Sequence, residues 1–414
     1  MPTPFEKISP IFKFLRCFSL LLTLAGAPLY LLRWHYGFLP TTLLEHLIAA
    51  TFIISVAEKL ISFSKRKKLS FSLPPRPLLL LIFFFLLTAT IALLITPDLR
   101  GGAGVWKAYF IEPWLFFFLL FDALKEKIVR PRQLALAYLI SAVFLALWGL
   151  LQTKGILIIT AAEGALQRAH GPFNSANALA LFLGPLLPLV LTRPFFLAHD
   201  RLKRSFIFFL LWSGLFATRS RGGIIASASV LFFLLLFPHL KEKLKKIKSA
   251  LWWIGVVSFL FLQLIVLNWA AAQAPEVDNP WQRRGGTLSI RLCLWQGTLD
   301  LLRDHPLSGA GLSGFKELYR DFYHTCDAEP LEYPHNLILN FWTELGLGGL
   351  LSFLAIFFLT LRSIITLDPG LAGAFLYWLV HGLVDVPYFK NDLALIFTAL
   401  TAWAWVIAAA DRQH

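Results

Sequence analysis

Hydrophobic residues make up 57% of the 414 residues and charged residues only 15%, whereas soluble chains carry about 25% charged residues. This composition excludes an ordinary soluble enzyme. The net charge of +14 falls in short loops between apolar runs, a placement that argues against a nucleic-acid-binding protein. Three cysteines at unrelated spacings exclude a disulfide framework and a zinc site.

Apolar runs of roughly 20 residues recur along the chain, and each is long enough to cross a bilayer. The first run lacks a small-residue cleavage site, so we expect a retained helix rather than a removed signal peptide. The fold class predicted is an all-α polytopic membrane protein, with one integral-membrane domain over residues 1–414. The twelve predicted spans lie near 12–33, 41–63, 77–96, 107–124, 134–153, 176–192, 205–218, 223–238, 250–271, 335–361, 368–384 and 393–410.

Every second loop is dense in Lys and Arg: "SKRKKLSFSLPPR", "KEKIVRPRQ", "TRPFFLAHDRLKR" and "KEKLKKIK". Positive loops stay cytoplasmic, so both termini are predicted to be cytoplasmic. The same charges favour contact with anionic membrane lipids.

The opposite side receives one long connection, predicted at 272–334 between the ninth and tenth spans. Connections of this length are usually functional or disordered, but this one has helical apolar periodicity. The segment "HPLSGAGLSGF" separates two such patterns, so we expect two short amphipathic helices over the outer mouth of the bundle. Cys293 and Cys326 could pair here. The apolar positions are Leu288, Leu292, Trp295, Leu299 and Leu302 in the first helix, and Phe315, Leu318, Tyr319 and Phe322 in the second.

The turn "TRSRGG" places Arg219 and Arg221 on this outer side, where the positive-inside rule gives no reason for arginine. One interpretation is snorkelling to lipid headgroups. The other is an anion site, because Gly222 and Gly223 permit close backbone approach and a helix begins there with free N–H groups. Arginine adds a planar fork that suits phosphate oxygens. We therefore expect Arg221 and Arg219 to bind a phosphate.

The first loop helix carries Arg291 beside its apolar stripe, so this side chain is predicted to point toward the membrane mouth. Arg283, Arg284 and Arg303 are near it in the sequence. For Arg284 a substrate-binding role and a solvated helix face are both open, and a solvated face is equally open for Arg303.

His335 and Asn336 open the tenth predicted span, in "YPHNLILNFWTELGLGGL". A histidine at a water–membrane boundary is suited to accept a proton. Glu344 lies inside the same apolar helix, and carboxylates within a membrane are costly and tend to be functional or paired. The glycines after it would let another helix approach closely.

Further polar residues stand where spans begin or end: Lys107 with Glu112, Arg168 with Asn177, and His381 with Asp385. A buried Lys107–Glu112 pair is one interpretation of the first set. No metal-ligand spacing, phosphate-binding loop or dinucleotide fingerprint occurs, so no cofactor is expected. A reaction on the outer side would need an activated substrate carried by the membrane.

These residues resemble the O-antigen ligase and polymerase superfamily, whose members handle undecaprenyl-diphosphate-linked glycans. The resemblance runs from about Lys107 onward and rests on four ordered signatures: "RAHGPFNSANALA", "TRSRGGIIA", "SIRLCLWQGTLDLLRDHPLSGAGLSGF" and "YPHNLILNFWTELGLGGL". It implies a GT-C-like helical fold and metal-independent, inverting transfer. Arg221 and Arg291 would engage the diphosphate, and His335 would act in glycosyl transfer. Arg219 is a departure, since the family's turn has one obvious arginine.

The resemblance implies a ligase at the periplasmic face of the bacterial inner membrane, acting in lipopolysaccharide biosynthesis. The donor would be a glycan on undecaprenyl diphosphate, and the acceptor a hydroxyl of lipid A–core, another glycan or a protein. A polysaccharide polymerase and a protein O-oligosaccharyltransferase remain alternatives, since they differ in the acceptor. A transporter is a further alternative, but transporters usually have pseudo-repeats and broken helices near the bilayer midplane. Here the polar residues crowd toward one face.

Overall fold

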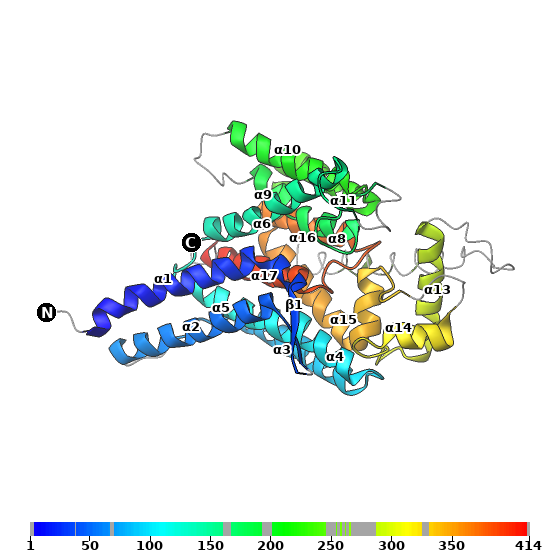
Figure 1. Cartoon of the computed structure of the whole chain (residues 1–414), viewed down its shortest axis with the longest axis horizontal. Helices are drawn as coiled ribbons and strands as arrows, with labels where there is room; N and C mark the ends of the chain where they lie inside the picture. Colours follow the sequence, from blue (N-terminus) through cyan, green and yellow to red (C-terminus); the bar gives the residue numbers. More distant parts are fainter. Residues whose placement is uncertain are drawn as a thin grey trace.

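The structure is a computed structural model, and nearly all of the residues it describes are helical (Figure 1). It describes residues 4–37, 39–66, 70–159, 167–192, 201–245, 287–324 and 331–411, with isolated positions between 246 and 286. The elements are α1 (Pro4–Ala25), η1 (Ala27–Leu31), β1 (Arg33–Tyr36), β2 (Leu39–Thr42), α2 (Leu43–Arg66), α3 (Arg76–Leu94), α4 (Leu99–Val105), η2 (Trp106–Ile111), α5 (Glu112–Lys125), α6 (Pro131–Thr153), α8 (Ala176–Leu183), α9 (Leu186–Thr192), α10 (Arg201–Ala217), α11 (Arg221–Lys245), α13 (Thr287–Asp304), α14 (Phe315–Leu318), η3 (Tyr319–Tyr323), α15 (Leu337–Ile364), α16 (Pro369–His381) and α17 (Asn391–Asp411).

Seven helices within the described residues are long and apolar enough to cross a membrane. The chain is therefore a multi-pass membrane protein, and the helical fold class is confirmed. The seven are Leu43–Phe63, Arg76–Leu94, Leu99–Lys125, Pro131–Thr153, Arg221–Lys243, Leu337–Ile364 and Asn391–Asp411. The count of twelve stays a prediction.

The other predicted spans differ from these seven for local reasons. The apolar run at 176–192 forms the short apolar helix Ala176–Thr192, which is interrupted between α8 and α9 because Pro185 has no N–H to donate. α10 and α16 are helices of only 17 and 13 residues. The first run is helical only to Ala25, followed by the 3-10 turn η1, which contains Pro28. The predicted span 250–271 lies outside the described residues, apart from isolated positions.

One small element departs from the all-α expectation. β1 and β2 form an antiparallel hairpin in which Arg33 pairs with Thr42 and Tyr36 with Leu39. It occupies the connection between the first two long helices. The Trp34 ring of the hairpin packs on His46 of α2, with 4.9 Å between the ring centroids.

The long helices run along the longest axis of the molecule, while α13 lies across one end (Figure 1). Both chain termini lie toward the opposite end from α13 and α14. α5 packs on α17, α3 on α15 and α11 on α16, so helices distant in the sequence form one bundle. Its centre is aromatic: the Phe341 and Phe353 rings stack at 3.7 Å, and Tyr388 lies 5.3 Å from Phe341.

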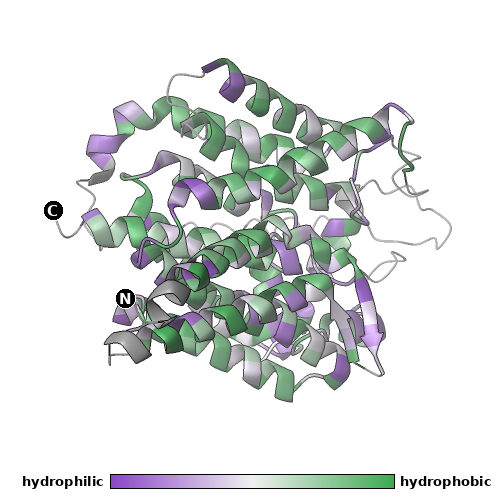
Figure 2. Cartoon of the chain, turned by 60° about the vertical axis from the view of Figure 1, so that its left-hand side comes forward, coloured by the Kyte–Doolittle hydropathy of each residue, from purple (hydrophilic) through white to green (hydrophobic). Residues whose placement is uncertain are grey.

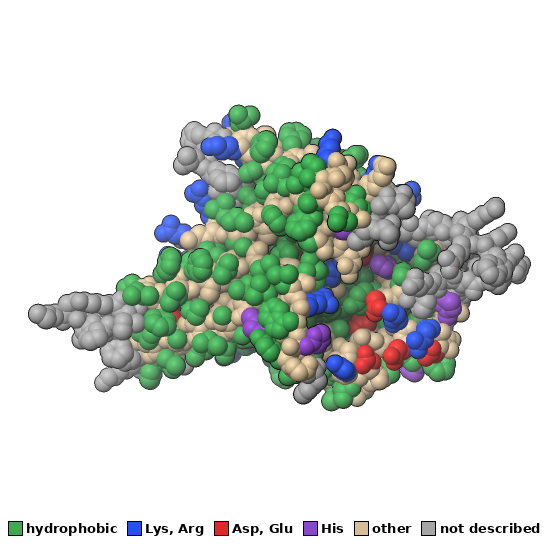
Figure 3. Space-filling model, in the orientation of Figure 1, with side chains coloured by type: hydrophobic (Ala, Val, Ile, Leu, Met, Phe, Trp, Pro, Cys, Tyr) green, Lys and Arg blue, Asp and Glu red, His purple; other side chains and the backbone are tan. Residues whose placement is uncertain are grey.

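The outer surface is apolar as well. Figure 2 shows hydrophobic residues along most of the helices and hydrophilic ones mainly toward their ends. Large side chains such as Ile53, Phe83 and Leu235 are exposed by 65%, 58% and 75%, and Figure 3 shows hydrophobic side chains covering much of one face. Soluble proteins rarely expose so much apolar surface, whereas a lipid bilayer would cover it.

α15 is kinked where the predicted outer loop meets it. Gly346 has a φ of 70°, and a Cβ there would stand 2.1 Å from the carbonyl oxygen of Leu307. The Leu347 N–H donates to this oxygen, and the Ala310 N–H donates to Thr343 O. The loop therefore approaches Gly346 here. The close helix approach that the glycines after Glu344 predict occurs at Gly348 of α15, which lies beside Thr88 of α3.

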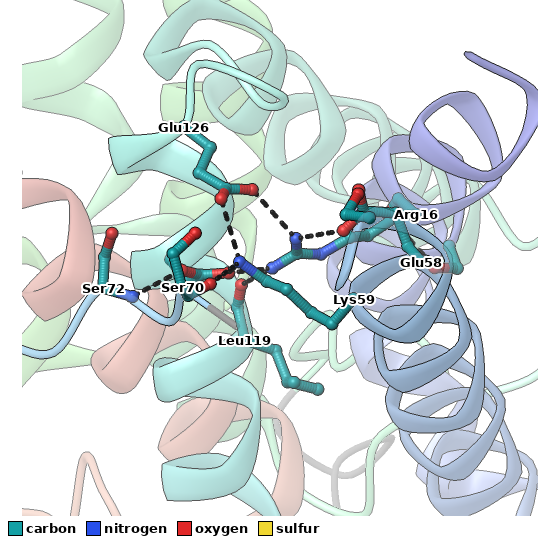
Figure 4. A network of polar contacts seen from close by, with 10 residues as sticks. Arg16, Glu58, Lys59, Ser70, Ser72, Leu119 and Glu126 are labelled. Atoms are coloured by element: carbon teal, nitrogen blue, oxygen red, sulfur yellow. Dashed lines mark hydrogen bonds and ion pairs between the residues drawn. The ribbon is translucent and has the colours of Figure 1, made fainter. Parts of the chain in front are cut away.

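A buried charge network joins α1, α2 and α5 (Figure 4). The Arg16 guanidinium donates to Asp122 Oδ2 at 2.6 Å, Glu58 Oε2 at 3.1 Å and Glu126 Oε2 at 3.3 Å. Lys59 Nζ contacts Asp122 Oδ2 at 2.6 Å and Glu126 Oε1 at 2.9 Å. Such a network fixes the relative positions of three helices, because no member can lose its partners without leaving a buried charge.

Candidate functional site

His335 is brought to Asp385 by the start of α15. Asn336 caps this helix, accepting from the N–H groups of Ile338 and Leu339 at 3.0 and 3.1 Å. Its side-chain amide donates to Leu383 O at 3.0 Å. The predicted substrate-binding residue Asn336 therefore has a positioning role in this structure, tying the start of α15 to the turn that follows α16.

His335 Nδ1 lies 3.3 Å from Asp385 Oδ1. A carboxylate can only accept, so Nδ1 carries the proton and Nε2 is left as an acceptor. His335 itself has a φ of 50°, a left-handed conformation that costs free energy and is often found at functional sites. The arrangement gives the imidazole a fixed orientation and a ring nitrogen able to take a proton.

The Asp385 carboxyl is held in its ionised form. Burial alone would raise its pKa, but the hydrogen bond from His335 and the positive groups around it outweigh burial and hold the pKa well below its usual range. The Val386 N–H also donates to Asp385 Oδ1, at 2.9 Å. Asp385 is therefore suited to stabilise a protonated His335.

A second chain of contacts reaches Asp385 from the segment before α8. The Asn177 amide donates to Asp385 Oδ2 at 2.8 Å, and Arg168 Nη2 donates to Asn177 Oδ1 at 3.0 Å. Arg168 Nε donates to Thr218 O at 2.9 Å. Two predicted substrate-binding residues, Arg168 and Asn177, thus support the His335–Asp385 pair.

Arg291 lies on α13 close to this pair. Burial lowers the pKa of its guanidinium, Asp385 acts in the opposite direction and Arg168 adds to the lowering. Within the described part of the chain, Arg291 makes no hydrogen bond or ion pair. A half-buried guanidinium with no acceptor is ready to bind an anion.

The turn before α11 is arranged differently from the prediction. Gly222 and Gly223 do allow close approach, but within the protein: a Cβ on Gly222 would stand 2.7 Å from Cγ2 of Val384, in the turn after α16, and one on Gly223 would stand 3.0 Å from Cβ of Ala180 in α8. Arg221 is exposed and makes no hydrogen bond or ion pair within the described ranges. Arg219 is exposed too, with a φ of 50°. Their roles in phosphate binding stay predictions.

Three other predicted residues have partners of their own. Lys107 is in η2, a π-helix, and its ion pair is with Glu45 of α2 at 2.8 Å rather than with Glu112, while its substrate-binding role stays a prediction. Glu344 is fully buried and accepts from the Ser313 N–H at 2.7 Å, which fastens the outer loop to α15. Arg303 pairs with Asp300 on the exposed face of α13, in agreement with a solvated face.

Some predictions fall where the structure is not described. Arg283, Arg284 and Cys326 lie outside the described residues, so the predicted role of Arg284 is untested. Cys293 is disulfide-bonded. In the residues that are described, no group of three or more His, Cys, Asp or Glu side chains could hold a metal ion.

The site lies at the end of the bundle that carries α13. Figure 3 shows acidic, basic and histidine side chains gathered toward that end beside a hollow, in contrast to the apolar sides. Together these features define a multi-pass helical membrane protein with a polar site at one end, built from an oriented His–Asp pair and an unpaired arginine.

Comparison with known families agrees with this class. Residues 206–354 match the family model described as O-antigen ligase. The match supports the resemblance to the O-antigen ligase and polymerase superfamily, and with it a role in polysaccharide biosynthesis. No curated protein matches the chain. The matched region includes Arg221, Arg291 and His335, while Arg168, Asn177 and Asp385 lie outside it.

Proposed function

We propose that the protein transfers a glycan from undecaprenyl diphosphate to an acceptor hydroxyl, with lipid A–core as the acceptor. The reaction would take place at the periplasmic face of the bacterial inner membrane, with both termini in the cytoplasm. The observation that carries the proposal is His335, oriented by Asp385, next to the unpaired guanidinium of Arg291. This arrangement supplies a proton acceptor and an anion-binding group at one site.

The proposed step is a direct displacement. The acceptor oxygen attacks the anomeric carbon, and the bond from that carbon to the diphosphate oxygen breaks as the new glycosidic bond forms. The acceptor proton passes to His335 Nε2, and the diphosphate leaves with the electron pair. Attack opposite the leaving group inverts the anomeric configuration, and no metal is required because cationic side chains balance the leaving charge.

Arg291 would stabilise the charge that develops on the leaving diphosphate, and Arg221 would assist from the first turn of α11. A positioned donor of this kind often contributes about 3 kcal/mol to transition-state stabilisation. General base catalysis by His335 would contribute about 10²- to 10⁴-fold in rate. Apolar surfaces between the spans would hold the polyprenyl chain.

The acceptor is tested by a gel of envelope glycolipids from a strain that lacks the gene, beside the same strain complemented. A ligase predicts loss of the glycan ladder on lipid A–core, with polymer accumulating on undecaprenyl diphosphate. Lipid A–core carrying a single repeat unit would instead identify a polymerase. An unchanged ladder with loss of glycan from a protein would identify an O-oligosaccharyltransferase.

A further inference from the structure

Lys390 is a cation in the connection between α16 and α17, which also contains Asp385. Its side chain is only partly exposed. Among the described residues its ammonium has no hydrogen bond and no ion pair. A partly buried ammonium that lacks a partner is costly, so its presence needs an explanation.

The backbone at Lys390 is held rigidly. The two preceding side chains are each 1% exposed: the Tyr388 hydroxyl donates to Tyr109 O at 2.8 Å, and the Phe389 ring packs among other aromatic rings. The Lys390 N–H donates to Tyr388 O at 2.7 Å, and its carbonyl accepts from the Ala394 N–H at 2.9 Å. The side chain therefore leaves the turn from a preorganised position.

The same packing links Lys390 to the His335 segment. The Phe389 ring lies 5.9 Å from the ring of Tyr333, two residues before His335. A shift of this turn would therefore move both Asp385 and the segment that carries His335. Lys390 is therefore part of the assembly that forms the site, although the sequence pattern did not single it out.

Nearby carboxylates do not supply the ion-pair partner that the Lys390 ammonium lacks. Burial lowers the pKa of Lys390, while Asp392 and Asp385 act in the opposite direction, so both are within electrostatic range. Neither forms an ion pair with it, since Asp385 is occupied by His335 and Asn177. Three cations, Arg168, Arg291 and Lys390, thus stand against two carboxylates, Asp385 and Asp392, and this excess of positive charge favours an anionic ligand.

We propose that Lys390 binds the diphosphate of the lipid-linked donor, together with Arg291. The proposal rests on the glycosyl transfer proposed above. Each phosphoryl group of a diphosphate diester carries one negative charge, and a further charge develops as the bond to the sugar breaks. Lysine acts here as a compact point charge with three donors, whereas arginine supplies a planar fork.

The test is a comparison of Lys390→Met, Lys390→Arg and Lys154→Met in purified protein, with lipid-linked donor and acceptor varied separately. Lys154 is an exposed lysine after α6 and serves as the matched control. Inorganic diphosphate is added as a competing anion. We expect Lys390→Met to lower kcat/KM for the donor by about 10- to 100-fold, to weaken inhibition by inorganic diphosphate, and to leave KM for the acceptor unchanged. Lys390→Arg should retain part of the activity, and Lys154→Met all of it.

Unchanged donor kinetics and unchanged diphosphate inhibition in Lys390→Met would overturn the proposal, as would a rise in acceptor KM alone. Thermal unfolding of each variant in detergent identifies a folding defect, and Lys390→Gln replaces Lys390→Met under the same criteria if that variant does not fold. If the wild-type protein itself transfers no glycan, the proposed function fails, a result that differs from a specific failure of Lys390.

Discussion

His335 and Asp385, 50 residues apart in the sequence, meet with Nδ1 and Oδ1 3.3 Å apart. The contact depends on the Asn336 cap and on the Leu337 N–H, which donates to Gly382 O at 2.7 Å. These contacts connect the start of α15 to the turn after α16 independently of the His335 and Asp385 side chains. They hold His335 against Asp385, and this contact fixes the tautomer in which Nε2 can accept a proton.

The first prediction concerns His335→Ala. Without the imidazole, the acceptor proton has no positioned base, so we expect the transfer rate to fall by about 10²- to 10⁴-fold. Rates are measured at matched protein levels, with His305→Ala on the outer loop as the control. Normal transfer by His335→Ala would contradict the proposal that His335 is the base.

The second prediction concerns Asp385→Asn. The amide cannot stabilise a protonated imidazole, so the acidic limb of the pH–rate profile should move to lower pH while transfer slows. A purely structural role for Asp385 would lower the rate at every pH without moving the limb.

Asp385 also gives a pH dependence of stability. Its pKa is depressed in the folded protein, so its contribution is present above the unfolded value of about 3.9 and is lost as the pH falls through the lower folded value. Melting temperatures of the wild type and Asp385→Asn should therefore differ most near neutral pH and converge in strong acid. A difference that grows toward acid would contradict this assignment.

The third prediction compares Arg291→Ala with Arg291→Lys. Loss of the guanidinium should reduce transfer by about 10²- to 10³-fold. The lysine variant should recover only part of this loss, because it keeps the charge but not the fork. Full activity of Arg291→Lys would show that charge alone is sufficient. The same pair of substitutions at Arg221 tests whether that exposed arginine takes part.

The fourth prediction is structural. Arg16→Met should destabilise the protein by about 3–5 kcal/mol, because it leaves the buried Glu58 without a cation and leaves Asp122 and Glu126 with Lys59 alone. Lys13→Met, an exposed position one turn earlier, is the control. Thermal unfolding in detergent measures both, and equal melting temperatures for the two variants would rule out a stabilising role for the network.

The sequence predicted the membrane class and the residues that its local patterns could reveal. Arg291 was found from helical periodicity, and His335 from its place at the start of an apolar run. The support around them could not be predicted in this way. Asn177 and Asp385 are separated by 208 positions, and only tertiary packing brings them together.

Local patterns left two features unrevealed. The glycines next to Arg221 suggested backbone approach to a ligand, and in the structure they also accommodate close packing against Val384 and Ala180. The apolar run predicted at 176–192 does form the short apolar helix Ala176–Thr192, but the pattern did not reveal its interruption at Pro185, between α8 and α9. Apolar content predicts that a segment is buried, but not how its backbone is broken.

Glycan transfer by this protein is tested most directly by reconstituting the purified protein with an undecaprenyl-diphosphate-linked glycan and a lipid A–core acceptor. We predict that glycan appears on the acceptor as undecaprenyl diphosphate is released in equal amount, and that His335→Ala abolishes both. Transfer that proceeds equally well in His335→Ala, or no transfer by a folded wild-type protein, would contradict it.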